Sequence, residues 1–134
     1  MDITKEILLG VDYGSHHVGF SIKSEGTTSA MPLSIFERNG GSDEQLIEHI
    51  KDLVAEHKIT AVIIGMPLTM EGKPGPQAER VALFIHLFHR SSETTMYDSD
   101  ERLTSAAVDH GAHDKAAALI LQGYIDREMN GNNV

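Results

Sequence analysis

Two short apolar runs constrain the fold of this chain more than any other feature. Residues 7–11 (Ile-Leu-Leu-Gly-Val) and residues 61–65 (Ala-Val-Ile-Ile-Gly) contain no charged side chain. Runs of this length that are bounded by turn residues are typical of strands buried on both faces, as in parallel sheets. A helical pattern lies between the two runs. We therefore expect them to be parallel strands of one sheet.

The segment that follows the first run predicts two further strands. Val18, Phe20 and Ile22 alternate with Gly, Ser and Lys, which indicates a strand with one buried face and a hairpin around residues 14–17. Residues 30–36 predict a third strand. Pro32 removes a backbone donor there, so this strand should lie at an edge or carry a bulge.

Three helices and a last strand complete the expected fold. Ser42 begins a capping box before apolar residues at helical spacing, and a Gly- and Pro-rich loop over residues 65–76 precedes a second amphipathic helix. Residues 94–97 predict a strand, and a short helical stretch follows Thr104. The final helix carries Ala118, Leu121 and Ile125 on one face. The prediction is an α/β fold over residues 1–134 as a single domain, with a mixed central sheet, in which a three-strand antiparallel meander joins parallel strands, flanked by helices.

Composition limits the classes of function. The 134 residues include no cysteine, and the formal net charge is -9. The absence of cysteine excludes disulfides and thiolate chemistry. Since the sequence also shows no long apolar run and no secretory signal, we expect a cytoplasmic protein without a membrane span. The negative charge opposes binding of nucleic acid unless a divalent cation inverts the local charge.

Acidic residues occur where the expected elements bring their ends together. Asp12 and the pair Asp100-Glu101 follow predicted strands, and the carboxyl ends of such strands form the site in open α/β sheets. Asp114 lies one turn before Ala118 on the apolar face of the last helix, where an unpaired charge is costly. Each acid alone could shape a turn or cap a helix. Together they favour an oxygen-ligand site for Mg²⁺ or Mn²⁺.

Such a site predicts metal-assisted hydrolysis of a phosphodiester. Arg102, Thr104 and the backbone amides of Gly72 or Gly75 are candidates for contacts with the phosphate backbone, although Arg102 could equally form a surface salt bridge. Other motifs fail. The loop after residue 65 lacks P-loop spacing, the histidines lack zinc spacing, and Ser15 has no evident triad partners.

Five segments together resemble one known family, RuvX, also called YqgF. They are residues 11–14 (Val-Asp-Tyr-Gly), 65–72 (Gly-Met-Pro-Leu-Thr-Met-Glu-Gly), 75–78 (Gly-Pro-Gln-Ala), 100–104 (Asp-Glu-Arg-Leu-Thr) and 114–124 (Asp-Lys-Ala-Ala-Ala-Leu-Ile-Leu-Gln-Gly-Tyr). The resemblance covers nearly the whole chain in the right order. It is therefore much more specific than any single motif.

The resemblance implies a ribonuclease H-like fold and a bacterial, cytoplasmic nuclease. The implied role is maturation of the 5′ end of pre-16S ribosomal RNA or resolution of Holliday junctions. The family's acidic positions correspond to Asp12, to the pair Asp100-Glu101, of which Glu101 is favoured, and to Asp114. The turn that contains Gly14 and Ser15 is expected to contact the substrate.

This chain departs from the resemblance in two places. Ser15-His16-His17 stands where relatives carry Lys and Arg, and only five residues, 109–113, connect Val108 to Asp114, where relatives carry a longer basic connection. Histidine gains charge near pH 6.5 in its unperturbed state, so nucleic-acid affinity should rise as the pH falls from about 7.5 to 6. The short connection removes much of the basic surface expected to grip a substrate.

The sequence leaves one other function open and argues against a third. A non-catalytic factor on the same fold could bind a ribosomal precursor or the transcription machinery through its acidic surface. Sugar kinases and actin-like ATPases also begin with a strand and an Asp-x-Gly turn, but they close two such domains around a nucleotide, and this chain supplies one. As a nuclease, the protein is expected to act as a monomer or weak homodimer on structured nucleic acid, either pre-16S RNA or branched DNA.

Overall fold

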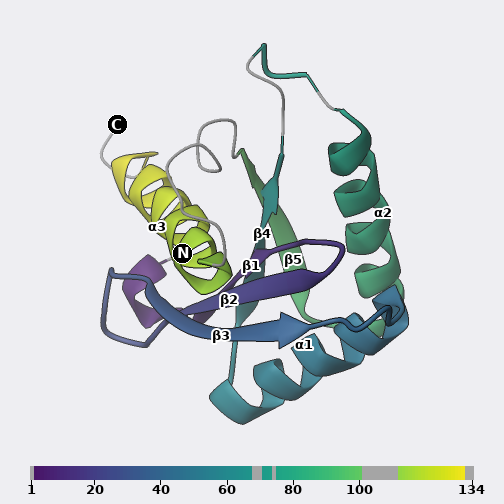
Figure 1. The fold of residues 1–134 in the computed structure, drawn as a ribbon. Coiled ribbons are helices and arrows are strands. Elements are labelled where there is room, and N and C mark those ends of the chain that lie inside the picture. Colours follow the sequence, from purple (N-terminus) through teal and green to yellow (C-terminus); the bar gives the residue numbers. More distant parts are fainter. Residues whose placement is uncertain (1, 68–70, 74, 101–111, 132–134) are drawn as a thin grey trace.

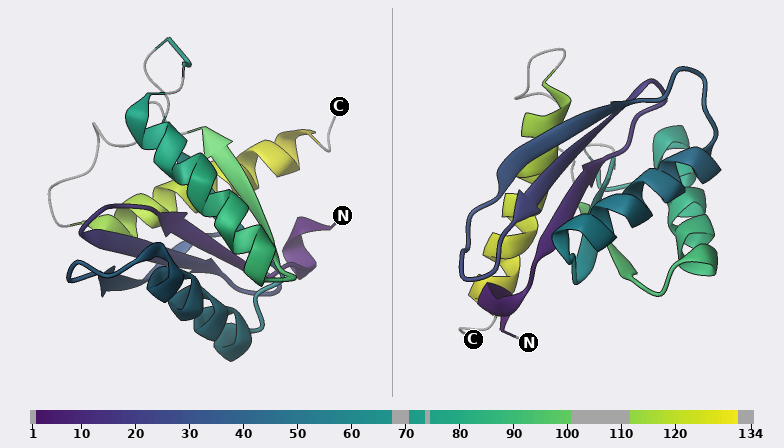
Figure 2. Two further views of the ribbon diagram at one scale, coloured as in Figure 1. Left: turned by 90° about the vertical axis from the view of Figure 1, so that its right-hand side faces the viewer. Right: turned by 90° about the horizontal axis from the view of Figure 1, so that it is seen from below.

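The protein folds as a twisted five-stranded sheet with helices on both faces (Figures 1 and 2). The computed structural model describes residues 2–67, 71–73, 75–100 and 112–131. The strand order is β3-β2-β1-β4-β5. Along the chain the elements are η1 (Ile3–Lys5), β1 (Leu8–Asp12), β2 (His17–Lys23), β3 (Met31–Glu37), α1 (Asp43–His57), β4 (Ala61–Met66), α2 (Pro76–Ser91), β5 (Thr95–Asp100) and α3 (His113–Gly131).

The pairing of the strands confirms the predicted mixed sheet. β1 pairs parallel with β4, and β4 with β5, whereas β2 pairs antiparallel with β1 and β3. β3 lies at an edge, and its register with β2 shifts between Phe20 and Ser21, opposite Pro32. The proline therefore coincides with both features predicted for it, an edge position and an irregular pairing.

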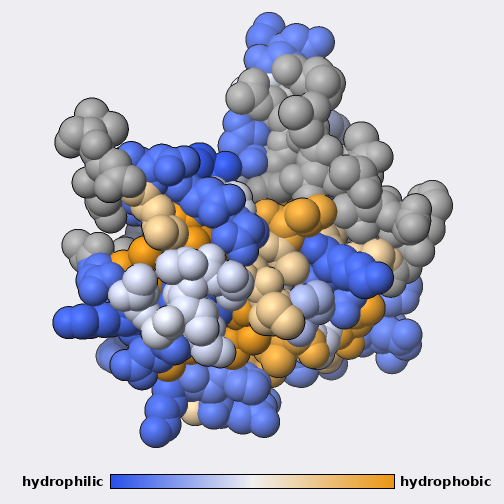
Figure 3. Space-filling model, turned by 90° about the vertical axis from the view of Figure 1, so that its left-hand side faces the viewer, coloured by the Kyte–Doolittle hydropathy of each residue, from blue (hydrophilic) through white to orange (hydrophobic). Residues whose placement is uncertain are grey.

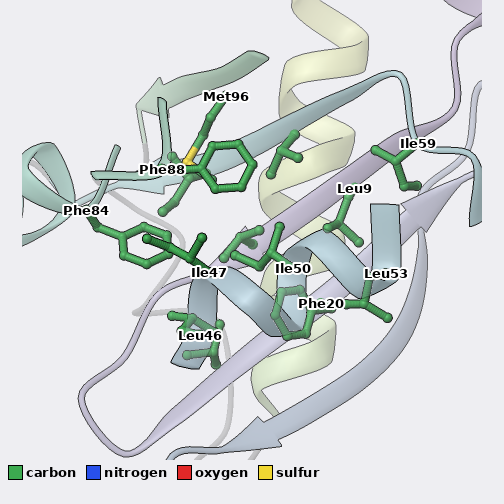
Figure 4. Close-up of a cluster of buried hydrophobic side chains, with 14 of the residues drawn as sticks. Leu9, Phe20, Leu46, Ile47, Ile50, Leu53, Ile59, Phe84, Phe88 and Met96 are labelled. Carbon is green, nitrogen blue, oxygen red and sulfur yellow. The ribbon is translucent and has the colours of Figure 1, made fainter. Parts of the chain in front are cut away.

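Helices α1 and α2 cover one face of the sheet and enclose the larger core with it. Ser42 caps α1, since its hydroxyl accepts a hydrogen bond from the Gln45 backbone amide at 3.3 Å. Apolar side chains from both helices meet those of the strands in the close-up of Figure 4. The labelled members of this core are Leu9, Phe20, Leu46, Ile47, Ile50, Leu53, Ile59, Phe84, Phe88 and Met96.

Helix α3 covers the opposite face and approaches the sheet closely. A Cβ added at Gly10 would stand 2.8 Å from the Leu121 Cβ and 2.9 Å from the Ala117 carbonyl oxygen, so only glycine fits there. The buried Ser21 hydroxyl donates to the same Ala117 oxygen at 2.7 Å. The side of the molecule that carries α3 is largely hydrophilic, with apolar residues reaching the surface in patches (Figure 3).

Three predicted details differ from the structure or lie outside it. Strand β5 ends at Asp100 rather than at residue 97, because an edge strand with exposed side chains tolerates acidic residues. The buried face of α3 is centred on Ala117, Leu121 and Ile125, and Ala118 is only partly buried. The short helical stretch expected after Thr104 lies outside the described residues. In the part of the chain that is described, every helix falls short of the length and apolarity needed to cross a membrane.

Candidate functional site

Asp12 ends strand β1 and lies on the face of the sheet that α3 covers. Alternate residues of a strand point to opposite faces. Leu9 and Val11 belong to the core under α1 and α2, and Leu8 belongs to the core under α3. Asp12 shares the face of Leu8, and its side chain is 33% exposed. A carboxylate is thus held at the carboxyl end of a central strand, partly shielded by the last helix.

The first residue of α3, His113, places its imidazole ring beside Asp12. The Nδ1 atom of His113 stands 3.9 Å from Oδ2 of Asp12. Burial raises the pKa of the Asp12 carboxyl group above its usual value, and the neighbouring His113 acts in the opposite direction. Since burial prevails, the ionised carboxylate lacks full compensation from the described residues. A cation placed beside it would supply that compensation.

Sequence reasoning singled out His17 for its charge, but it did not anticipate that His17 stacks on His113, the residue beside Asp12. The rings of His113 and His17 stack at a centroid distance of 5.0 Å and an interplanar angle of 16°. His17 Nε2 lies 3.9 Å from Oε1 of Glu37. The available signal was position, because His113 directly precedes an expected site acid and His17 ends the turn that follows Asp12.

Asp114 lies in the first turn of α3, close to the strand that pairs with Asp12. Asp12 and Gly19 are register partners, and a Cβ added at Gly19 would stand 1.9 Å from the His113 carbonyl oxygen and 2.9 Å from the Asp114 backbone nitrogen. The Asp114 carboxylate accepts a hydrogen bond from the Lys115 amide at 2.9 Å, a favourable place for an anion on a helix. The structure therefore brings the backbone of Asp114 to the end of β1 that carries Asp12.

A buried guanidinium holds the turn between β1 and β2, which includes Gly14 and the exposed Ser15. Arg38 is 8% exposed, and it donates to the Gly14 carbonyl at 3.1 Å and to Asp43 Oδ1 at 2.6 Å. The Tyr13 hydroxyl donates to the same Asp43 oxygen at 2.8 Å, and the guanidinium lies 5.3 Å from the centre of the Tyr13 ring. These contacts tie the residues directly after Asp12 to β3 and α1.

Of the predicted acidic pair Asp100-Glu101, the structure describes only Asp100. Asp100 is the last residue of β5, and by strand alternation it shares the face of Met96, which belongs to the core under α1 and α2. Asp100 therefore does not share the face of Asp12. Glu101, Arg102 and Thr104 lie outside the described residues, so their predicted roles stay predictions.

The two glycines predicted to contact phosphate lie in the connection from β4 to α2. Gly72 has a positive φ of 79°, which suits glycine, and Gly75 is the N-cap residue of α2. Their predicted contacts with substrate stay predictions.

The donor atoms at the site suit a hard cation, but the described part does not form a complete set. Asp12 and Asp114 offer carboxylate oxygens, the ligands that Mg²⁺ and Mn²⁺ prefer. Within residues 2–67, 71–73, 75–100 and 112–131, no group of three or more His, Cys, Asp or Glu side chains is arranged to hold a metal. A third ligand would have to come from elsewhere in the chain, and Glu101 is the candidate that the resemblance supplies.

Solved structures of Holliday junction resolvases share this architecture. RuvC of Thermus thermophilus, in complex with a Holliday junction, aligns with a TM-score of 0.62 at 10% identity, covering 92% of this chain and 96% of that one. The fowlpox virus Holliday junction resolvase aligns with a TM-score of 0.54 at 14% identity, covering 90% and 99%. These likenesses confirm the predicted ribonuclease H-like fold.

Comparison of sequences identifies the family. A protein of Halalkalibacterium halodurans named "Putative pre-16S rRNA nuclease" is 33% identical over 135 residues, covering 90% of this chain and 96% of its own. A protein of Desulforudis audaxviator with the same name is 31% identical over 140 residues, covering 94% and 98%. A family model described as "RuvX: Holliday junction resolvase" matches residues 6–127. Because this match spans most of the sequence, the chain belongs to the RuvX family.

Proposed function

We propose that this protein is a divalent-metal-dependent nuclease that hydrolyses phosphodiester bonds in structured nucleic acid. The observation that carries the proposal is the position of Asp12, at the carboxyl end of a central strand and beside the helix N-terminus that carries Asp114. The relatives named as pre-16S rRNA nucleases support the 5′ end of that precursor as substrate, and the family description supports a four-way DNA junction.

Asp12, Glu101 and Asp114 are the residues that would hold Mg²⁺ or Mn²⁺. When bound, such an ion would supply stabilisation of the charge that develops on the phosphate during in-line displacement. The protein's own contribution is placement. Arg38 holds the turn after Asp12, while Gly19 lets α3 bring Asp114 close to β2. The amino end of α3 is the positive end of the helix dipole and favours an anionic group at the same place.

Cleavage of two substrates tests this proposal. A 5′-extended 16S precursor and a four-way DNA junction are incubated with Mg²⁺ or Mn²⁺ and with the wild-type protein, Asp12→Asn or Asp52→Asn. Asp52 is exposed on α1, on the other face of the sheet, so its variant is the matched control. Cleavage of one substrate that Asp12→Asn abolishes and Asp52→Asn retains supports the nuclease and selects its nucleic acid. Isothermal titration with Mn²⁺ should show weaker binding to Asp12→Asn.

The net charge of -9 favours one other candidate, a non-catalytic factor that binds a ribosomal precursor or the transcription machinery. Absence of metal-dependent cleavage, together with an Asp12→Asn variant that keeps its cellular role, would favour that factor. A cytoplasmic location and a monomer or weak homodimer are part of the same proposal.

A further inference from the structure

Two tyrosine rings form an exposed platform at the edge of the sheet. Tyr97 of β5 and Tyr124 of α3 stack at a centroid distance of 6.3 Å and an interplanar angle of 19°. Tyr97 is 43% exposed although it is large and aromatic, and β5 is an edge strand. A ring supported from behind by a second ring offers a rigid surface for stacking.

A guanidinium lies beside the platform. Arg127 of α3 donates a hydrogen bond to the hydroxyl of Ser99. Ser99 is buried on the face of β5 that is directed toward α3. Ser99 follows Tyr97 by two residues and so shares its face of the strand. Because guanidinium carries five N–H donors, the bond to Ser99 orients Arg127 and leaves further donors for an anion.

The strand register connects this surface to Asp12. Val11 pairs with Ile64, and Gly65 pairs with Ser99, so Asp12, Gly65 and Ser99 lie side by side on three adjacent strands. Adjacent strands are about 4.8 Å apart, which places the backbone of Ser99 about 10 Å from that of Asp12. Both side chains are on the face of α3, and Gly65 between them has no side chain.

The two sides of the platform differ in charge: the Tyr124 side lies near carboxylates, and the Ser99 side lies near Arg127. Burial, followed by Glu128, Tyr97 and Glu6, raises the pKa of the Tyr124 hydroxyl. The two carboxylates, Glu128 and Glu6, disfavour an anion on that side of the platform. Arg127 provides positive charge on the Ser99 side. An uncharged base over the rings and a phosphate at Arg127 match this distribution.

From this arrangement we propose that Tyr97, Tyr124 and Arg127 bind unpaired nucleotides of the nucleic-acid substrate, with a base stacked on Tyr97 and a phosphate at Arg127. The proposal rests on the proposed function and adds a preference for single-stranded segments beside the cleavage site. In a duplex the faces of the bases are covered by their neighbours, so a protein ring stacks on unpaired bases.

The protein's own fluorescence gives a direct test. The chain has three tyrosines and no tryptophan, and the third tyrosine, Tyr13, is bonded to Asp43 away from the platform. Tyrosine emission is followed while a short single-stranded RNA, or the same RNA in a duplex, is added to the full chain in EDTA. The single strand should quench the emission saturably and the duplex should not. Tyr97→Leu should weaken single-strand binding by about fivefold or more, while Tyr97→Phe keeps it.

Two further variants distinguish binding at this surface from non-specific binding of RNA elsewhere on the protein. Arg127→Gln should weaken binding and lower its salt dependence by about one phosphate contact. Leu83→Ala, at an exposed apolar residue of α2, should bind as the wild type does. The proposal is overturned if Tyr97→Leu binds RNA as tightly as wild type, if the duplex binds equally well, or if light scattering shows that Tyr97→Leu dissociates a dimer. Because the assay needs no cleavage, it can fail while the nuclease stands, or succeed where no cleavage is found.

Discussion

At the scale of single residues, Asp12 carries a cost in stability. Its pKa is raised by burial, so the folded protein binds that proton more tightly than the unfolded chain does. The favourable contribution of the protonated form is present below the ordinary value of 3.8 and is lost as the pH rises through the raised pKa. At neutral pH the ionised Asp12 therefore destabilises the metal-free fold.

We accordingly expect Asp12→Asn to melt a few degrees higher than wild type at about pH 7 without metal, because the variant removes the partly buried charge. The gain should shrink as the pH falls and the wild-type carboxyl group takes up its proton. Calorimetry over this pH range measures the difference, with Asp52→Asn as the exposed control. A gain that is the same at all pH values would contradict this explanation.

Arg38 is the second single residue whose side chain should affect stability, because it holds the turn that follows Asp12. Arg38→Met would remove the guanidinium from the Gly14 carbonyl and from the Asp43 carboxylate, which would keep only the Tyr13 hydroxyl as a donor. We expect a loss of about 3 kcal/mol in the free energy of unfolding. Tyr13→Phe, which removes one hydroxyl from the same cluster, should cost about 1 kcal/mol. Urea unfolding measures both. Equal losses for the two variants would show that the guanidinium is not the centre of this cluster.

At the scale of elements, the contact between β2 and α3 positions the candidate site. Gly19→Ala puts a Cβ into the His113 carbonyl, so the first turn of α3 must move, at a cost of about 3 kcal/mol. Gly123→Ala, in the middle of the same helix, meets only the end of the Arg127 side chain at 3.4 Å or more, and should stabilise α3 by up to about 1 kcal/mol.

Thermal unfolding and cleavage assays on the two glycine variants test this contact. We expect Gly19→Ala to lose activity at temperatures where it is still folded, because Asp114 is displaced from Asp12, while Gly123→Ala stays active. A fully active Gly19→Ala would show that the spacing between β2 and α3 does not matter to the reaction.

The sequence predicted the elements better than it predicted their ends and contacts. Apolar runs and alternation located β1, β2 and β4, because burial on two faces or one leaves a clear pattern. The predicted end of β5 was wrong, because acidic residues on an exposed edge strand have the polarity that is typical of a loop. His17 and His113 could not be paired from the sequence, because their stacking depends on how α3 crosses β2. The distance between them along the chain conveys nothing of that crossing.

At the scale of the whole molecule, net charge controls the approach of a polyanion. The chain carries a formal charge of -9 with its eight histidines neutral, and each protonated histidine reduces the repulsion of nucleic acid. We expect affinity for RNA to rise as the pH falls from about 7.5 to 6, and the His16→Ala/His17→Ala double variant to respond less. Anisotropy titrations with labelled RNA at constant ionic strength measure this. Identical pH profiles for the two proteins would exclude the turn histidines as the cause.

The crossing of α3 over β1 and β2 has a consequence for synthesis. Asp12 leaves the ribosome well before Asp114, and contacts between segments so distant along the chain form late in folding. Before α3 arrives, the face of the sheet around Gly10 and Ser21 is uncovered and the acids of the proposed site are apart. Under the proposed function, a nascent copy cannot cut the RNA that surrounds it until α3 has emerged and packed on the sheet.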